Sequence, residues 1–437
     1  AGAILSLLRL DSMIEDALRY TTGLTDIKEV DRVITALAQA PLLHQLMRIC
    51  PLPDLQLEAL FVSMRRVLLV GFGQIEASPE IIYFLSTLSL HCFTNEYAYF
   101  ETEEEAELIS VLEATIAERV AQASQPTLSE TLILAAYRPL HQYDWSKKLQ
   151  VLDQLPEVKV RLVEEPLGED VIAQNIPALS DVDDGVSRKV REQYEESPYP
   201  RWVKLAIAPK EKSVAEFCNE AKLQLHSENI KSVFSPSILV AGCGTGQHSI
   251  ETASRFANCK VTAVDLSRAS LAYAQRKTSE LGITSVEYLQ ADILNLGELG
   301  EEFDIIESSG VLHHMDDPMA GWRVLADLLK AGGLMKIGLY SELARRHILK
   351  TRGEIELQGI GTSEFEIRQF RRSLAASHNE NHESLTKWPD FFSLSELRDL
   401  IFHVQEHRFT LPKIHKSLND LGLKFCGFEN ADVVGQF

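Results

Sequence analysis

Five short apolar segments between residues 237 and 340 alternate with segments that can form helices or connections. These segments are Ser237 to Ala241, Lys260 to Leu266, Val286 to Gln290, Phe303 to Ser308 and Gly333 to Tyr340. Strands that alternate with helices pair in parallel, because each crossover carries the chain back to the same edge of the sheet. One crossover helix is expected to begin at Pro318 and to end at Gly332 or Gly333. The sequence therefore predicts an α/β fold with a parallel, doubly wound sheet.

A glycine-rich loop follows the first of these segments. Gly242, Gly244 and Gly246 have the spacing G-x-G-x-G, and a segment that can form a helix comes next. Glycines let the backbone turn tightly and approach a ligand, while a helix N-terminus offers N–H donors. Position 247, where a dinucleotide-binding fingerprint has its third glycine, is Gln. Binding of a pyrophosphate is therefore disfavoured at this loop.

Acidic residues end the next two strands. Asp265 comes 23 positions after Gly242, where a carboxylate can accept both hydroxyl groups of a ribose. Asp292 follows the third strand, in a position to accept a hydrogen bond from an adenine amino group. Both NAD and S-adenosyl-L-methionine (SAM) carry this ribose. The two acids together with the glycine loop are much more specific than either feature alone.

Four segments resemble the class I SAM-dependent methyltransferases in their order and spacing. They are VAGCGTGQ from residue 240, VDLS from residue 264, QAD from residue 290 and SSGVLHHMDDP from residue 308. The resemblance covers roughly residues 186 to 340. It implies a Rossmann-like, mostly parallel sheet of the class I methyltransferase type, an enzyme that transfers a methyl group, and SAM as its cofactor.

The resemblance also assigns cofactor-binding residues. It implies that the glycine loop, with Gly242, Cys243, Gly244 and Gly246, approaches the amino-acid part of SAM. The end of the second strand, with Asp265 and Leu266, would hold the ribose, and the end of the third, with Asp292 and Ile293, would frame the adenine. Ser309, at the end of the fourth strand, would lie near the methionine. The small size of Cys243 is a sufficient reason for its place in the loop.

Methyl transfer from SAM needs few catalytic side chains. The sulfonium is already activated, so the enzyme mainly aligns the acceptor, and a base helps only when the acceptor must lose a proton. His313 and His314, at the carboxyl end of the fourth strand, are the candidate bases. The alternative is that one of them packs against the cofactor and the other caps the loop.

Tyrosines supply the remaining candidates for the acceptor side. Tyr194 is a third catalytic candidate, and Tyr199 and Tyr340 are candidates for contact with the acceptor. The alternative for the first two is aromatic burial in a segment stiffened by prolines, and for Tyr340 a place in the core.

The sequence before residue 189 has a different character. Residues 1 to 150 carry apolar residues at helical spacing, which predicts an all-helical domain for recognition or assembly. Within it, Thr102 and Glu105 form a capping-box pattern ahead of an apolar face. Residues 151 to 188 contain prolines and an acidic run and are interpreted as a linker. Residues 189 to 437 are interpreted as the SAM-binding methyltransferase domain, with a substrate-side insert at about 341 to 424.

Two longer segments suggest a narrower resemblance. Residues 190 to 202 (VREQYEESPYPRW) look like the segment that in many such enzymes folds over the cofactor, and residues 391 to 414 share further similarity. Together they resemble a bacterial group in which a methyltransferase is joined to tetratricopeptide or other helical N-terminal regions. We find no convincing repeat of tetratricopeptide length.

The two ends of the chain suggest truncation. The first residue is Ala. Residues Lys424 to Glu429 (KFCGFE) are expected to form a strand, and the final strand of the class is either ADVVGQF at the end of the chain or cut off.

Composition limits the partners. The chain has 43 Lys and Arg against 63 Asp and Glu, a net charge of -20, which disfavours nucleic acid. No apolar run approaches the ~18 residues of a membrane span, so no membrane association is expected. Six cysteines without C-x-x-C spacing fit a reducing cytoplasm. Residues 403 to 407 (HVQEH) formally fit an inverted zinc-peptidase motif, but with no identifiable third ligand we predict no metal.

The function predicted is SAM-dependent methyl transfer to an unidentified acceptor. A protein or peptide is slightly favoured over a small molecule, because helical arrays offer extended concave surfaces. Two alternatives stay open, an NAD-dependent oxidoreductase and a non-catalytic SAM-binding scaffold. Assembly into a homo-oligomer also stays open.

Overall fold

The structure is a computed structural model of the 437-residue chain, and it describes residues 8, 9, 11–19, 24, 27–73, 78–180 and 184–429. The chain divides into two units. The helical unit comprises residues 1–168, 202–204 and 347–402. The sheet unit comprises residues 169–201, 205–346 and 403–437. The chain therefore passes between the units several times.

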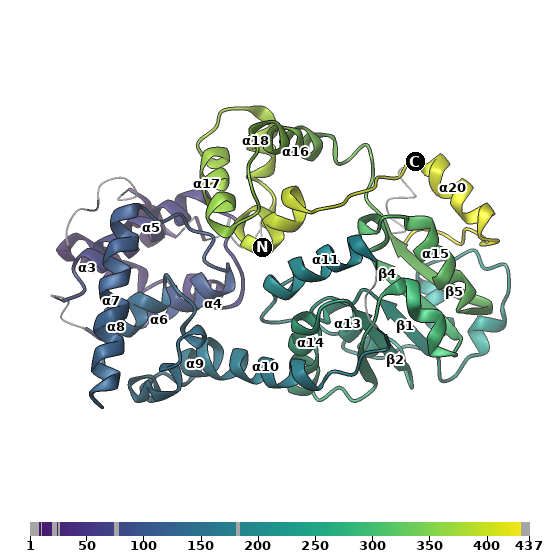
Figure 1. The fold of residues 1–437 in the computed structure, drawn as a ribbon, viewed down its shortest axis with the longest axis horizontal. Helices are drawn as coiled ribbons and strands as arrows, with labels where there is room; N and C mark the ends of the chain where they lie inside the picture. The colour runs from purple at the N-terminus through teal and green to yellow at the C-terminus, as the bar shows by residue number, and fades with distance from the viewer. Residues whose placement is uncertain are drawn as a thin grey trace. The chain divides into compact units, whose positions relative to one another are not determined.

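The described part of the helical unit is built from helices and short turns (Figure 1). Its α-helices are α2 (Ser12–Leu18), α3 (Ile27–Leu37), α4 (Pro41–Ile49), α5 (Leu55–Val70), α6 (Pro79–Thr94), α7 (Glu103–Ala121), α8 (Leu128–Ala135), α9 (Pro156–Lys159), α17 (Glu364–Ala375), α18 (Glu380–Leu385) and α19 (Leu394–Leu397). Helices α10 (Glu165–Asn175) and α16 (Arg346–Gln358) each begin in one unit and end in the other. Tight 3₁₀ or π turns occupy Leu140–Gln142, Ser146–Lys148, Gln150–Gln154, Val160–Glu164, Pro389–Phe392 and Arg398–Phe402.

Local sequence signals set the start of several of these helices. The hydroxyl of Thr102 accepts from the backbone N–H of Glu105, whose side chain accepts from the Thr102 N–H, so the predicted capping box is confirmed. Such reciprocal bonds satisfy donors that the first turn of a helix leaves open. The buried face of α7 includes the apolar residues of the predicted pattern, Ile109, Leu112, Ile116 and Val120.

Two buried apolar clusters form the core of the helical unit. The larger one lies among the helices between α2 and α10, and α6 is buried over most of its circumference. The smaller one joins the helices of residues 347–402 to Leu55 and Ala98. A buried ion pair between Arg371 and Glu58, 2.6 Å apart, also links these two stretches of the chain. Residues 347–402 therefore complete the core of the helical unit.

The sheet unit contains five parallel strands in the order β3-β2-β1-β4-β5 (Figure 1). This arrangement confirms the predicted doubly wound, parallel sheet. The strands are β1 (Ser237–Ala241), β2 (Lys260–Asp265), β3 (Val286–Gln290), β4 (Phe303–Ser309) and β5 (Leu329–Gly338). The segments between them form α13 (Gln247–Arg255), α14 (Arg268–Glu280), a 3₁₀ stretch at Ile293–Leu299 and α15 (Pro318–Asp327).

The two faces of the sheet bury different helices. Ile238 and Val240 of β1 belong to a cluster with residues of α13 and α14, whereas Leu239 and Ala241 belong to a cluster with residues of α15. Successive side chains of a strand point to opposite faces, so a strand that is apolar throughout is covered on both sides. In open α/β sheets covered in this way, ligands bind at the carboxyl ends of the strands.

Two sequence predictions near the fifth strand are wrong. Helix α15 ends at Asp327 rather than at the glycine pair, and β5 already begins at Leu329. The pairing of β4 with β5 is irregular where it starts, and a Cβ on Gly333 would lie 2.7 Å from the carbonyl oxygen of Asp304. Gly333 therefore permits a close approach between two strands instead of ending a helix.

The end of the chain also differs from the prediction. Lys424 to Glu429 forms no strand, although the carbonyl of Cys426 accepts from the N–H of Gln224 at 2.8 Å. A single hydrogen bond of this kind does not make a ladder. The segment ADVVGQF lies outside the described residues.

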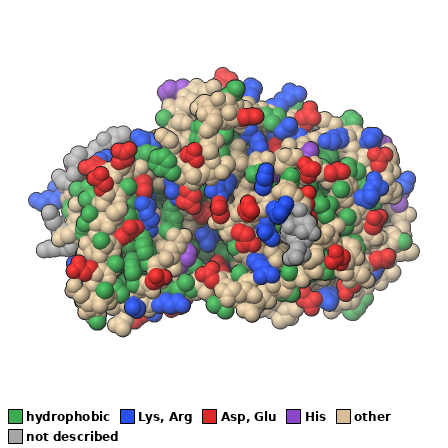
Figure 2. All heavy atoms as spheres, in the orientation of Figure 1, with side chains coloured by type: hydrophobic (Ala, Val, Ile, Leu, Met, Phe, Trp, Pro, Cys, Tyr) green, Lys and Arg blue, Asp and Glu red, His purple; other side chains and the backbone are tan. Residues whose placement is uncertain are grey.

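Three further α-helices and a 3₁₀ turn at Asn229–Ser232 also belong to the described sheet unit. The α-helices are α11 (Gly185–Glu196), α12 (Val214–Glu220) and α20 (Leu411–Asp420). No helix in the described part of the chain is long and apolar enough to cross a membrane. Acidic and basic side chains are interspersed on the face shown in Figure 2.

Candidate active site

The loop after β1 is shaped by three glycines in left-handed conformations. The φ angles of Gly242, Gly244 and Gly246 are 76°, 52° and 85°, values that residues with a Cβ rarely adopt. A Cβ on Gly242 would lie 2.2 Å from Val311, and one on Gly246 would lie 2.6 Å from the Cβ atom of Ala274. Glycine is therefore needed here both for the turn and for close packing.

Backbone hydrogen bonds tie this loop to the end of β2. The N–H groups of Gly242 and Cys243 both donate to the carbonyl of Val264, at 2.8 and 2.9 Å. Cys243 is buried, and its burial raises the pKa of the thiol well above the usual range. The thiol therefore stays protonated, in agreement with a role set by its size.

Asp265 stands at the centre of the loop contacts. Its two carboxylate oxygens accept from the backbone N–H groups of Gly244, at 2.8 Å, and Ser267, at 3.0 Å. Removal from water raises the pKa of Asp265, and these backbone hydrogen bonds offset only part of that effect. A carboxylate has about four lone-pair positions. Asp265 therefore keeps acceptor capacity for hydroxyl groups of a ligand.

The ends of β2 and β3 are linked by one amide. The side-chain amide of Gln290 donates to the carbonyl of Leu266 at 2.9 Å and accepts from Nε of Arg268 at 2.7 Å. This link fixes the backbone of Leu266, one of the residues implied for ribose binding. Sequence reasoning gave Gln290 no role, because its partners are set by strand pairing rather than by local pattern.

Asp292 and Ile293 follow β3 directly and are buried. The side chain of Asp292 accepts from the N–H of Leu294 at 3.0 Å and so caps the 3₁₀ stretch that follows. This bond holds the carboxylate at the carboxyl end of β3. Its contact with an adenine amino group stays a prediction.

Helix α11 is anchored beside Asp265. The carboxylate of Glu195 accepts from the N–H groups of Arg268 and Ala269, at 2.7 and 3.0 Å, which are the first residues of α14. The hydroxyl of Ser267 donates to the carbonyl of Tyr194 at 3.0 Å. A carboxylate at a helix N-terminus is favoured by the helix dipole and by donors that lack intrahelical partners. Sequence reasoning missed Glu195, because no local pattern reports a cap supplied from 73 residues away.

The segment after α11 touches the glycine loop itself. The carbonyl of Tyr199 accepts from the N–H of Thr245 at 3.3 Å, and the Thr245 hydroxyl donates to the carbonyl of Pro200. The rings of Tyr194 and Tyr199 are 6.3 Å apart. The structure therefore brings Tyr199 next to the glycine loop, with the ring of Tyr194 beside that of Tyr199.

The end of β4 carries Ser309 and the two histidines. Ser309 pairs with Gly338 of β5, and a Cβ on Gly338 would lie 2.7 Å from the Ser309 hydroxyl oxygen. Gly310 follows with φ 78°, and Leu312–His314 form a 3₁₀ turn. Ser309 thus lies at the carboxyl edge of the sheet.

His313 is completely buried. Its exposed fraction is 0%, and neither ring nitrogen has a hydrogen-bond partner among the described residues. Burial, together with the charges of His314 and Arg345, lowers the pKa of His313 to about 2. The ring is neutral at physiological pH. Its observed contact is packing, with the Tyr340 ring 3.7 Å away between centroids.

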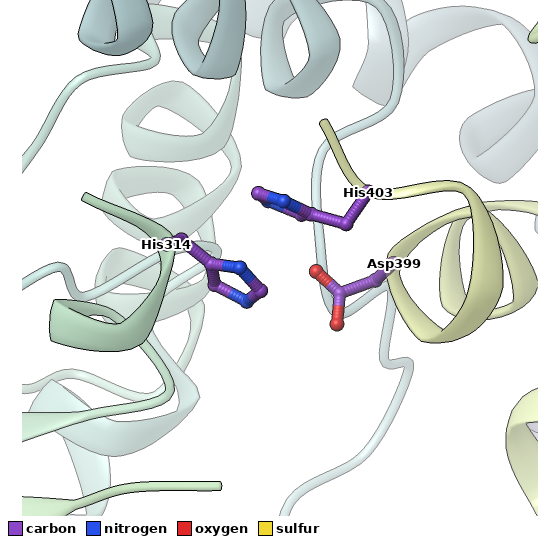
Figure 3. Close-up of side chains that lie close together, drawn as sticks. All are labelled: His314, Asp399 and His403. Atoms are coloured by element: carbon purple, nitrogen blue, oxygen red, sulfur yellow. The ribbon is translucent and has the colours of Figure 1, made fainter. Parts of the chain in front are cut away.

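His314 faces a histidine from a distant part of the chain. Its ring stacks on that of His403, with centroids 3.6 Å apart and planes 25° apart (Figure 3). Nδ1 of His314 lies 2.7 Å from the carbonyl oxygen of Gln405, so this nitrogen carries the proton and donates. The ring of Tyr194 lies 6.0 Å from that of His403. His314 and Tyr194 are therefore connected through His403.

Residues 403–409, which we name the strap, run from the loop after β4 to the loop after β5. The N–H of His407 donates to the carbonyl of His313 at 2.6 Å. At its other end Phe409 exchanges backbone hydrogen bonds with Tyr340 and Glu342, at 2.9 and 3.1 Å. The strap is thus held by the backbone at the carboxyl ends of β4 and β5.

The strap also makes a buried ion pair. Glu406 accepts from Nε and Nη2 of Arg345, at 3.0 and 2.6 Å. The two side chains are 1% and 6% exposed, respectively. The Arg345 guanidinium lies 3.7 Å from the centroid of the Tyr340 ring. Arg345 therefore contacts protein groups with both its N–H donors and its flat face.

Arg371 of the helical unit is likewise held by protein groups, the carbonyl of Phe391 and the carboxylate of Glu58.

The strap is not helical. His403 and His407 therefore do not share a helix face, as the inverted zinc motif would require. The ring of His403 packs on His314, and Nε2 of His407 lies 3.1 Å from the carbonyl oxygen of Asp316.

A buried carboxylate, Glu307, lies on the face of β4 that α13 covers. Glu307 contacts three side chains of α13: His248 at 2.8 Å, Thr252 at 2.5 Å and Arg255 at 3.4 Å. Burial alone would raise the pKa of Glu307, but the hydrogen bond and charge of His248 lower it to about 2. This network fastens α13, and with it the glycine loop, to the sheet.

Comparison with known proteins identifies the fold's relatives. Residues 238–333 match the model of a family described as a methyltransferase domain. The chain is 31% identical over 209 residues to an uncharacterized protein of Synechococcus, covering 45% of this chain and 49% of that protein. It is 38% identical over 97 residues to a ubiquinone biosynthesis O-methyltransferase of Pseudomonas syringae, covering 22% and 40%. The chain thus spans about half, or less, of the length of these relatives.

A second named methyltransferase and a solved structure also match the chain. The chain is 31% identical over 115 residues to (S)-coclaurine N-methyltransferase of Papaver somniferum, covering 26% of this chain and 32% of the enzyme. Among solved structures, PKMT2 from Rickettsia typhi aligns at a TM-score of 0.39 and 18% identity, over 49% of this chain and 44% of that one.

The sheet unit therefore contains a SAM-dependent methyltransferase domain of class I. The matched residues begin in β1 and include the glycine loop, Asp265, Asp292 and the histidine pair. The residues present fit SAM, because the loop is free of Cβ atoms at three turns and Asp265 offers acceptors for ribose hydroxyls. This assignment answers the choice between SAM and NAD that the two acids alone left open. A tetratricopeptide repeat in the helical unit is not shown.

Proposed function

We propose that the protein transfers the methyl group of SAM to an acceptor bound beside the carboxyl ends of β4 and β5. The observation that carries the proposal is the position of Asp265. Its carboxylate is fixed by the N–H groups of Gly244 and Ser267, within the segment matched to methyltransferases. In open α/β sheets, ligands bind at this edge of the strands.

Each residue has a physical task in this proposal. Asp265 accepts from the ribose hydroxyls, the glycine loop receives the amino-acid part, and Asp292 with Ile293 frames the adenine. SAM itself supplies an activated methyl group when bound. The residues at the carboxyl ends of β4 and β5 then have to align the acceptor and exclude water, because alignment is the main contribution that the transfer needs.

The role of the histidines follows from their surroundings. His313 is neutral and buried, which favours packing over proton transfer for this residue. His314 is the better candidate base, since its ring is held in one orientation by the contact of Nδ1 with the Gln405 carbonyl and by stacking on His403. Tyr199 and Tyr340 are proposed to contact the acceptor, and Tyr194 to act beside His314.

We propose a protein or peptide as the acceptor, recognised through the helical unit. The support is the size of that unit, which holds its own apolar core and contributes no strand of the sheet among the described residues. A small-molecule acceptor is the second candidate. It is favoured by the names of two relatives, an enzyme of ubiquinone biosynthesis and an N-methyltransferase of coclaurine.

The test uses methyl-labelled SAM and an extract of Synechococcus, the source of the relative that aligns over 209 residues. Macromolecules and small molecules are separated after the reaction, and the label in each fraction is compared with that of an Asp265→Ala control. Label in protein supports the first acceptor class, and label in the small-molecule fraction supports the second. A protein that binds S-adenosylhomocysteine (SAH) but transfers no label to either fraction supports the scaffold alternative.

A further inference from the structure

The side-chain contacts around the strap form a closed ring, which we call the circuit, that begins and ends at Arg345. Arg345 lies over the ring of Tyr340, and Tyr340 packs on His313. The circuit continues through His314, whose ring lies 4.3 Å from that of His313, to His403 at the start of the strap. It closes through Glu406 of the strap, which returns to Arg345.

The ion pair and the three imidazole rings in the circuit are buried, whereas Tyr340 is half-buried. Arg345, Glu406 and His403 are exposed by 6%, 1% and 2%, and His313 and His314 by 0% and 5%. Buried groups in contact cannot move independently, because protein interiors are close-packed. A displacement of the strap would therefore displace the imidazole rings after β4.

The ion pair sets the geometry of this circuit. Arg345 presents two N–H groups to one carboxylate while its flat face covers the Tyr340 ring. A guanidinium can do both at once because it is planar, whereas an ammonium cannot. Glu406 also lies 3.6 Å from Nη1 of Arg408, so this buried carboxylate is held by two arginines.

We propose that Arg345 and Glu406 are positioning residues for the acceptor side of the methyl-transfer site. They hold the strap across the carboxyl ends of β4 and β5, and through Tyr340 they fix His313 and His314. This inference rests on the proposed function. It assigns Arg345 an indirect task, in place of the direct contact with an acidic acceptor that its charge alone suggests.

The cofactor side is a separate set of contacts. Asp265 is fixed by Gly244 and Ser267, and α11 is fixed by Glu195. Loss of the ion pair should therefore leave the affinity for SAH within about twofold while it lowers methyl transfer. The loss of transfer is expected to be about 100-fold, the scale that a misplacement of about 1 Å produces.

The test compares Arg345→Met with Arg276→Met. Arg276 forms a similar ion pair with Glu169 in the same unit, at 2.6 Å and with side chains 12% and 14% exposed. Three quantities are measured: the SAH dissociation constant by calorimetry, hydrogen exchange of the peptide 403–409, and label transfer at several dilutions of the acceptor fraction. Arg345→Lys serves as the conservative variant.

We expect Arg345→Met to keep SAH affinity, to speed exchange in the strap about tenfold, and to lose transfer most strongly at high dilution of the acceptor. Arg345→Lys should recover part of the transfer, and Glu406→Gln should resemble Arg345→Met. Arg276→Met should keep both the methyl transfer and the slow hydrogen exchange of the strap.

Three outcomes would each overturn the assignment: equal loss of transfer in Arg276→Met, loss of SAH binding in Arg345→Met, or unchanged hydrogen exchange of the strap in Arg345→Met. Absence of transfer in the wild-type protein would instead overturn the proposed function, and this inference with it.

Discussion

The carbonyl oxygen of Tyr199 lies 2.5 Å from the position that a Cβ on Gly244 would occupy. The same glycine donates its N–H to Asp265. One residue without a side chain thus lets the segment after α11 approach the glycine loop and at the same time orients the carboxylate of Asp265.

Gly244→Ala tests this relationship. The new Cβ would clash with a backbone atom, and the φ of 52° would strain any residue but glycine. We expect SAH affinity to fall about 30-fold and stability to fall by about 2 kcal/mol. Calorimetry and thermal unfolding measure the two effects. Gly297→Ala is the matched control, because a Cβ there meets nothing within 4 Å. Equal effects in both variants would contradict the explanation.

The pH dependence of SAH binding should report on Asp265. Its pKa is raised by burial, so its carboxylate is neutralised at a higher pH than an ordinary aspartate. A protonated carboxyl has less capacity to accept from ribose hydroxyls. We therefore expect SAH affinity, measured by calorimetry, to fall as the solution is made acidic, beginning at a higher pH than an ordinary aspartate would give. Asp265→Asn should bind weakly at every pH, and a variant with the wild-type pH profile would refute the assignment.

Glu307 should contribute to acid stability. Its pKa in the folded protein is about 2, below the usual 4.5, so its stabilising contribution is complete above pH 4.5 and is lost as the pH falls toward 2. Glu307→Gln should cost about 3 kcal/mol at pH 7, because it leaves Arg255 and His248 without their buried partner. Denaturant unfolding at pH 7 and pH 3 measures this difference, which should shrink at pH 3. Glu287→Gln, at an exposed ion pair with Lys260, should change stability little.

The capping box of α7 offers a test in the helical unit. Thr102→Ala removes the acceptor for the Glu105 N–H and should cost about 1 kcal/mol. Thr115→Ala in the same helix is the control, since its hydroxyl bonds only to the carbonyl of Val111 in the preceding turn. Circular dichroism during denaturation gives both values. Matching midpoints for the two variants would show that the cap contributes nothing.

The fold of the sheet unit could be predicted because its signals are local. Each strand is a short apolar run, and the glycine loop has a spacing that only a tight turn uses. The start of β5 could not be predicted, because the need for Gly333 comes from its close approach to the carbonyl of Asp304 on a neighbouring strand. Lys424 to Glu429 has the composition of a strand but forms none, since pairing rather than propensity decides.

The candidate site could be predicted only in part. Asp265 and the glycines follow strands directly, so their place at the sheet edge comes with the strand assignment. Glu195 and Glu406 bind Arg268 and Arg345, which are 73 and 61 positions away in the sequence. A periodic pattern in the sequence cannot predict contacts over such separations. The strap shows the same limit, since HVQEH has helical spacing yet forms no helix, and His403 packs on His314.

The division of the chain also bears on how the protein is made. Residues 347–402 belong to the helical unit, but they are synthesised after all five strands of the sheet. At about 5–20 residues per second, the ribosome needs roughly 10–40 s to make the intervening residues 169–346. During that time Leu55 and Ala98 lack the apolar partners that they have in the finished core. The smaller core of the helical unit is therefore completed only after all five strands of the sheet have been synthesised.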